Sequence, residues 1–191
     1  MSVEAELTAV VRDPERVRAK LAERAKTETI VYADTHYDRP DHSMDRDGYE
    51  LRVRTITTGD NRRFVLTYKE PPVDEASRSK PEHETTVADP DVMGTNFDGL
   101  GLVELISLEK HCDNYRFTAD GSDMLATVVT IPELNGQTFI ELETMTEPDD
   151  LKDALAPVRV VLDDLGVTED NALTESYTDM VANAHYLAGP G

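Results

Sequence analysis

The stretch GYELRVRTITTGDNRRFVLTYKEP (48–71) contains two segments of alternating residue types joined by turn-forming residues. The segments YELRVRTIT (49–57) and RRFVLTYKE (62–70) flank Thr-Gly-Asp-Asn, a combination that predicts a β-hairpin. Side chains alternate between the two faces of a strand, so Arg52 and Arg54 share one face and apolar residues occupy the other. The hairpin therefore presents a row of cations on one side of a predicted sheet.

Strand patterns recur on both sides of this hairpin. Alternation or β-branched and aromatic enrichment predicts six further strands, at residues 2–11, 27–38, 83–88, 103–118, 124–131 and 138–145. Consecutive hairpins imply antiparallel pairing, and eight antiparallel strands can close around a ligand-sized space. We expect an α+β fold, an eight-stranded antiparallel β-barrel or tunnel with flanking helices.

Four helices are expected outside the sheet. Asp13 as N-cap and Pro14 as first helical residue predict a helix over residues 14–25. The others are predicted at 89–101, 149–165 and 173–186, with Pro157 kinking or splitting the third and with Tyr177 and Met180 in the core. Polar loops are expected at 39–48 and 71–81. We expect one domain over residues 1–191, with C-terminal helices (149–186) packing on the barrel.

The formal net charge of -20, with a pI near 4.4, excludes several classes of function. A surface with this much negative charge repels phosphate backbones and anionic lipids. We therefore expect no nucleic-acid partner and no membrane partner. No apolar run long enough to span a membrane and no signal peptide is recognisable, and the single cysteine, Cys112, excludes an internal disulfide. A cytoplasmic location is the expectation. Abundant carboxylates with more arginine than lysine resemble the proteins of salt-loving, halophilic microbes.

Charged residues share strand faces at several further positions: Glu4 and Glu6, Lys69 with Thr67, Glu82 and Glu84, Lys110 and Cys112, and Glu141 and Glu143. One interpretation is that these are ordinary wet outer faces of a sandwich. The other is that the charged faces point into a barrel and helices cover the apolar faces. Such a lumen would offer carboxylates to Mg²⁺ or Mn²⁺ and Arg and Lys to phosphate oxygens, a combination that fits a polyphosphate substrate carrying metal.

Several segments, in order, resemble motifs of the CYTH superfamily, the triphosphate tunnel metalloenzymes, and above all its class IV adenylyl cyclase-like branch. They are VEAEL (3–7), DTHYDRPD (34–41), GYELRVR (48–54), LTYKEP (66–71), PEHETTV (81–87), LEKHCDNY (108–115), FIELET (139–144) and LTESYTDMV (173–181). The resemblance covers nearly the whole chain.

The resemblance implies roles for individual residues. Glu4, Glu6, Glu141 and Glu143 resemble the family's metal-binding carboxylates, for Mg²⁺ or Mn²⁺. Arg52, Arg54, Lys69 and Lys110 resemble the cations that bind the triphosphate, and Glu82 and Glu84 resemble further tunnel residues.

Three positions depart from the family pattern. Thr8 stands in place of a lysine, Cys112 in place of an arginine, and no carboxylate occurs near Val129–Thr130, where the pattern has an acidic residue. Each missing charge-assisted contact is worth ~1.5–3 kcal/mol, so these departures bear on activity more than on fold.

The resemblance implies a partner, a nucleoside or inorganic triphosphate, and it leaves a homodimer open. The first functional hypothesis is an adenylyl cyclase, converting ATP to cyclic AMP and pyrophosphate. The alternatives are a hydrolase of tripolyphosphate or thiamine triphosphate and a non-catalytic binding module. No general base is evident. His36, His42, His83, His111 and His185 lack metal-ligand spacing and are expected to be surface or structural, and Cys112 is expected to be a small strand residue.

Overall fold

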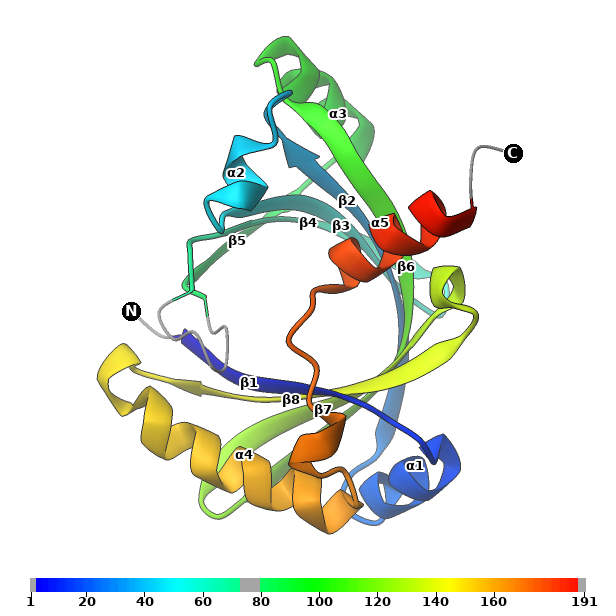
Figure 1. The fold of residues 1–191 in the computed structure, drawn as a ribbon, viewed down its shortest axis with the longest axis vertical. Coiled ribbons are helices and arrows are strands. Elements are labelled where there is room, and N and C mark those ends of the chain that lie inside the picture. The colour runs from blue at the N-terminus through cyan, green and yellow to red at the C-terminus, as the bar shows by residue number, and fades with distance from the viewer. Residues whose placement is uncertain (1–2, 73–79, 189–191) are drawn as a thin grey trace.

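The predicted strands form one continuous antiparallel sheet that curls around a central space (Figure 1). The computed structural model describes residues 3–72 and 80–188, with side chains described as far as residue 184. The strands are β1 (Val3–Val10), β2 (Thr27–Asp38), β3 (Glu50–Thr58), β4 (Asn61–Lys69), β5 (Glu82–Val87), β6 (Val103–Ala119), β7 (Ser122–Ile131) and β8 (Gln137–Thr146). Their order is β1-β8-β7-β6-β2-β3-β4-β5, and every neighbouring pair is antiparallel.

The two edge strands of this sheet, β1 and β5, approach each other and close the curl. Among the described residues, their meeting point is an isolated antiparallel bridge between Val3 and Pro81, and Glu70 donates its N–H to the Pro81 carbonyl at 2.9 Å. Beside this bridge, Lys69 Nζ lies 3.2 Å from Glu4 Oε2. The predicted α+β fold with an eight-stranded antiparallel sheet is confirmed, and side chains complete the closure of the tunnel.

The helices are α1 (Pro14–Ala22), α2 (Ser43–Arg46), α3 (Pro90–Gly99), α4 (Leu151–Leu165) and α5 (Tyr177–Ala188), with short 3-10 turns η1 (Pro132–Leu134), η2 (Pro148–Asp150) and η3 (Glu169–Asn171). The Asp13 side chain caps α1 by accepting a hydrogen bond from the Arg16 N–H, as predicted. The helices α1 and α4 pack on the outer face of β1, β7 and β8, where the largest apolar cluster lies. No helix in the described part of the chain has both the length and the apolarity to cross a membrane.

Two local predictions differ from the structure, and a third falls partly outside the described residues. Pro157 was predicted to kink or split its helix, and it does not split α4, because the buried face of the helix, including Val158 and Leu162, packs on the sheet. The predicted loop 39–48 contains the short helix α2, held by the Asp38 carboxylate, which accepts three backbone N–H hydrogen bonds. Residues 73–79 of the other predicted loop lie outside the described residues.

The last helix starts later than its predicted first residue, 173. The segment before it pairs with β1 through a bridge between Ala9 and Ala172 and a 2.8 Å hydrogen bond from the Leu173 N–H to the Thr8 carbonyl. In Figure 1 this segment crosses the opening of the curled sheet before α5 begins. The helix then packs Val181 against the inner apolar cluster that contains Phe139, and it covers one part of the space inside the sheet.

Candidate functional site

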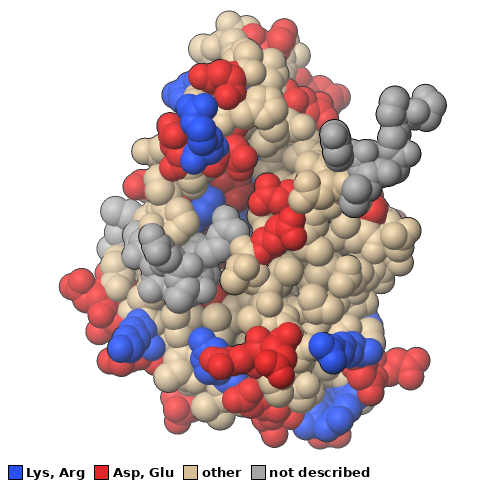
Figure 2. All heavy atoms as spheres, in the orientation of Figure 1, with Lys and Arg blue, Asp and Glu red and all other residues tan. Residues whose placement is uncertain are grey.

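A cavity of about 340 Å³ lies inside the curled sheet and extends past β1 to residues of α4. Its lining includes all eight residues predicted to bind metal or triphosphate: Glu4, Glu6, Arg52, Arg54, Lys69, Lys110, Glu141 and Glu143. Figure 2 shows a recess on this face with acidic and basic atoms at its floor. The interpretation that placed these charges on wet outer faces is therefore wrong for these side chains.

One wall of the cavity is acidic and is formed by β1 and β8. Strand register pairs Glu6 with Glu143 and Thr8 with Glu141, so the inward carboxylates of the two strands become neighbours. One carboxylate oxygen from each of Glu4, Glu6 and Glu143 lies within 4.8 Å of the other two. The alternation of each strand is the local cause, because it turns alternate residues to the same face.

Three carboxylates of this wall, Glu4, Glu6 and Glu143, have raised pKa values, whereas Lys110 lowers the pKa of Glu141 against the opposing effect of burial. Burial, followed by the charges of Glu4, Glu6 and Glu141, raises the pKa of Glu143 to about 9. Burial is also the main cause that raises the pKa of Glu4 to about 7 and raises the pKa of Glu6. Removing carboxylates from water and placing them together disfavours their charged forms.

The donor set of the acidic wall fits a divalent cation. Three carboxylates that repel one another in a half-buried space would be relieved by a positive charge, and hard oxygen ligands suit Mg²⁺ or Mn²⁺. Glu141, the fourth predicted ligand, lies in the same wall, but its carboxylate is engaged by Lys110 at 2.9 Å.

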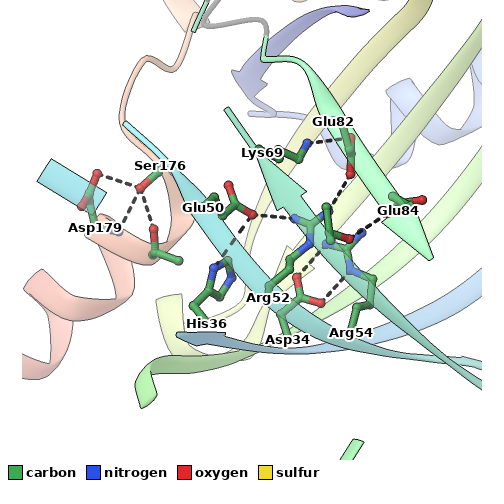
Figure 3. Close-up of polar contacts among 12 residues, drawn as sticks. Asp34, His36, Glu50, Arg52, Arg54, Lys69, Glu82, Glu84, Ser176 and Asp179 are labelled. Carbon is green, nitrogen blue, oxygen red and sulfur yellow. Dashed lines mark hydrogen bonds and ion pairs between the residues drawn. The ribbon is translucent and has the colours of Figure 1, made fainter. Parts of the chain in front are cut away.

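The opposite wall is cationic, and its arginines form ion pairs with neighbouring carboxylates (Figure 3). Arg54 binds Asp34 with two hydrogen bonds of 2.6 Å, and its guanidinium lies 4.5 Å from the centre of the Tyr32 ring. Burial alone would raise the pKa of Asp34, but the Arg54 charge and hydrogen bonds lower it well below its ordinary value. Arg52 contacts Glu50 at 3.0 Å, and its Nε is buried without a hydrogen-bond partner.

The two walls meet through lysines. Lys69 Nζ lies 3.2 Å from Glu4 Oε2 and 3.0 Å from Glu82 Oε2. These two contacts connect β4 to β1 and to β5, the edge strands of the sheet. On the other side Lys110 binds Glu141 and lies 4.7 Å from the centre of the Tyr177 ring. Both lysines thus connect the acidic strands to the cationic ones.

The structure separates Glu82 from Glu84, which were predicted together as tunnel residues. Glu82 is largely buried and pairs with Lys69 and with Arg52, at 3.6 Å in the second case. Glu84 is exposed and accepts a hydrogen bond from Thr67 at 2.8 Å. Neither residue lines the cavity. Glu82 contributes to the site indirectly, because it pairs with Lys69 and Arg52, which do line it.

The positions that depart from the family pattern lie in different surroundings. Thr8 lines the cavity and donates a 2.9 Å hydrogen bond to Glu6. Cys112 is buried in the inner apolar cluster with Val129, as expected for a small strand residue, and burial raises the pKa of its thiol to about 12. Thr130, half-buried, supplies no carboxylate either.

Sequence reasoning missed Asp34, Glu50 and His36 as residues of the cavity lining. Glu50 shares a strand face with Arg52 and Arg54 because it alternates with them on the same strand. Asp34 lies directly opposite Arg54 in the pairing of β2 with β3, so the strand register would have identified it. Of the two expectations for His36, surface or structural, its exposure of only 7% excludes the first, and its side chain lines the cavity.

The remaining histidines differ from His36. His42, His83 and His111 are exposed, as expected. The side chain of His185 lies outside the described residues.

Comparisons with known proteins agree with this fold. A protein of Methanocaldococcus jannaschii that carries the name "putative adenylate cyclase MJ0240" is 26% identical over 140 residues, covering 73% of this chain and 77% of that protein. The PH1819 protein of Pyrococcus horikoshii OT3 superposes with a TM-score of 0.83 at 24% identity, covering 95% of this chain and 99% of that one. HpAC1 from Hippeastrum, whose structure is reported with a dominant triphosphatase activity, superposes with a TM-score of 0.67 at 18% identity over 96% of each chain. The CYTH domain model matches residues 3–177, and the chain therefore belongs to the CYTH domain family.

Proposed function

We propose that this protein is a metal-dependent enzyme that binds a triphosphate in the cavity and cleaves one of its phosphoanhydride bonds. The observation that carries the proposal is the pair of opposed walls, carboxylates on β1 and β8 and cations on β3, β4 and β6, around one cavity. CYTH proteins in general bind triphosphates and depend on metal ions.

The roles follow from the donor types. Glu4, Glu6 and Glu143 would hold Mg²⁺ or Mn²⁺, which supplies Lewis-acid stabilisation of charge on phosphate oxygens. Arg54 uses Nε and one Nη2 hydrogen on Asp34, so its remaining N–H groups are available to a phosphate. Arg52 lines the same cavity and holds Glu50 through Nη1, so other N–H groups of its guanidinium would serve the same purpose.

For the reaction, we propose cyclisation of ATP in the manner of a class IV adenylyl cyclase. The ribose 3′-hydroxyl would attack the α-phosphorus and lose its proton to solvent, the bond from that phosphorus to the bridging oxygen would break, and pyrophosphate would leave. Arg52, Arg54, Lys69 and Lys110 would neutralise the leaving pyrophosphate. The name of the Methanocaldococcus relative supports this choice.

The apolar part of the cavity lining supports an organic group on the substrate. Besides the charged residues, the lining includes Leu108, Leu173 and Tyr177, which belong to the inner apolar cluster or pack against it. Inorganic tripolyphosphate has no apolar surface to place against these side chains, whereas a nucleoside does.

The second candidate is a triphosphatase, in which water attacks the terminal phosphorus. The activity reported for the Hippeastrum neighbour favours it. A binding module without turnover is the third outcome, and the missing cation at Thr8 favours it because one phosphate contact is lost.

A product assay separates the three. Purified protein is incubated with ATP and Mn²⁺ in molar salt, and nucleotides and phosphates are resolved by chromatography. We expect cyclic AMP and pyrophosphate in equal amounts, and a Lys69→Met variant should produce far less. Release of orthophosphate without cyclic AMP would instead establish the hydrolase, and tight calorimetric binding without any product would establish the binding module.

A further inference from the structure

His36 is a buried histidine that none of the roles above uses. It lies on β2, directly opposite Arg52 of β3 in the strand register, and its side chain lines the cavity. Figure 3 shows its ring directed toward the Glu50 carboxylate, beside the guanidinium of Arg52. Among the histidines whose side chains are described, it is the buried one.

The carboxylates around His36 are already engaged by arginines. Its Nδ1 is 3.9 Å from Glu50 Oε1, which is longer than a hydrogen bond, while Arg52 Nη1 reaches the same oxygen at 3.0 Å. Asp34, two residues away on the same strand, is bound by both nitrogens of the Arg54 fork. From β6, the register neighbour of His36 is the apolar Ile106.

These surroundings keep the imidazole neutral without a ligand. Burial is the main cause that lowers the pKa of His36 to about 4; the charges of Arg52 and Arg54 act in the same direction, and those of Glu50 and Asp34 oppose it. A triphosphate beside Arg52 would bring several negative charges to the same place. A nearby negative charge favours the protonated form of histidine. A bound triphosphate is therefore expected to raise the pKa of His36 and to favour the imidazolium over the neutral ring.

We propose that His36 is a phosphate-binding residue that takes one proton from solvent when a triphosphate binds beside Arg52. The imidazolium then donates a charge-assisted hydrogen bond to a phosphate oxygen, and no covalent bond forms or breaks. The inference rests on the proposed function, because it requires a triphosphate in this cavity. It adds to the predicted cations a residue whose charge appears only with the ligand.

The test measures proton uptake by calorimetry. Tripolyphosphate is titrated into metal-free protein in EDTA at about pH 6, in two buffers of different ionisation enthalpy. Protons taken up by the polyanion or by Glu4 are common to all variants, so the comparison is with His36→Gln, which keeps a donor but does not titrate in this range. We expect the wild type to take up close to one proton more than His36→Gln, and exposed His83→Gln to match the wild type.

The pH dependence of affinity gives a second measure. Between about pH 8 and pH 5.5, the wild-type affinity should increase roughly tenfold more than that of His36→Gln, which corresponds to one linked proton. If His36→Gln fails to fold, the ring resonances of wild-type histidines decide the matter. The buried imidazole should titrate above about pH 6 with tripolyphosphate and well below it without.

The outcomes separate the two proposals. Wild-type protein that does not bind tripolyphosphate or ATP, with or without metal, would overturn the proposed function. Wild-type protein that binds normally, but with the proton uptake of His36→Gln or with an unchanged ring titration, would overturn the role of His36 alone.

Discussion

Lys110 Nζ lies 2.9 Å from Glu141 Oε1, and the same ammonium group lies 4.7 Å from the centre of the Tyr177 ring. A residue predicted to bind phosphate is thus paired with a residue predicted to bind metal. Lys69 repeats the arrangement with Glu4 at 3.2 Å. Each lysine is thus paired with a carboxylate, and we expect triphosphate and metal to compete for the two partners.

The first prediction concerns Glu141→Gln. The substitution removes the carboxylate that holds Lys110, so metal-free affinity for tripolyphosphate should rise about three- to tenfold, as expected for freeing one charge-assisted contact. Affinity for Mn²⁺ should fall by about tenfold, because Glu141 lies beside the three carboxylates that would hold the metal and its charge supports them. Calorimetry in EDTA, and then with Mn²⁺ alone, measures the two effects separately.

A charge-matched control is Glu104→Gln on β6, which is exposed and hydrogen-bonds Ser107. It removes the same charge from the molecule but far from the lysines. An equal gain in polyphosphate affinity for both variants would mean that overall charge, and not the release of Lys110, is responsible.

The second prediction concerns the stability of the Asp34–Arg54 pair. The Asp34 side chain is 1% exposed and that of Arg54 13%, so Asp34→Ala leaves a buried guanidinium without its counterion. We expect a loss of roughly 3–5 kcal/mol in the free energy of unfolding, measured with denaturant. The double variant Asp34→Ala with Arg54→Met should recover much of this loss, and no recovery would show that the pair is not energetically coupled.

The third prediction links pH, metal and stability. The pKa of Glu143 is raised to about 9 and that of Glu4 to about 7, so in the folded protein both stay protonated at a pH where the unfolded chain has ionised. The stability that these groups contribute is complete below about pH 4.5 and is lost as pH rises toward 9. A divalent cation replaces the protons, so its stabilising effect should increase with pH.

Thermal unfolding in EDTA and in Mg²⁺ tests this. The melting temperature in EDTA should fall between about pH 5 and pH 9, and the increase caused by Mg²⁺ should be larger at the higher pH. The Glu143→Gln variant should flatten both trends. A Mg²⁺ effect of equal size at both ends of the range would argue against the acidic wall as the cation site.

The strand patterns were predictable because alternation is a local property. Arg52 and Arg54 have to share a face if residues 49–57 form a strand, and the same holds for Glu141 and Glu143. Which face lies inside cannot be read from alternation alone. It depends on the curl of the whole sheet, which only the family resemblance indicated.

The missed residues depend on relations between distant segments. His36 has no distinguishing sequence neighbour, and its burial arises from the pairing of β2 with both β3 and β6. The continuity of α4 through Pro157 also depends on distant segments. Packing of the helix on the sheet outweighs the low helix propensity of proline, which would break an isolated helix.

The last prediction separates two of the departures from the family pattern. Thr8 lines the cavity and hydrogen-bonds Glu6, so Thr8→Lys places a cation beside a carboxylate in a space that can hold it. Cys112 is 1% exposed and packs with Phe139 and Val181, so Cys112→Arg buries a guanidinium among apolar groups. The first variant should keep a wild-type melting temperature and gain polyphosphate affinity, whereas the second should lose ~3 kcal/mol or more, about 10 °C in melting temperature. Equal stability of the two variants would contradict the packing of α5 over Cys112, because only a cavity open to water at that position could accept the charge.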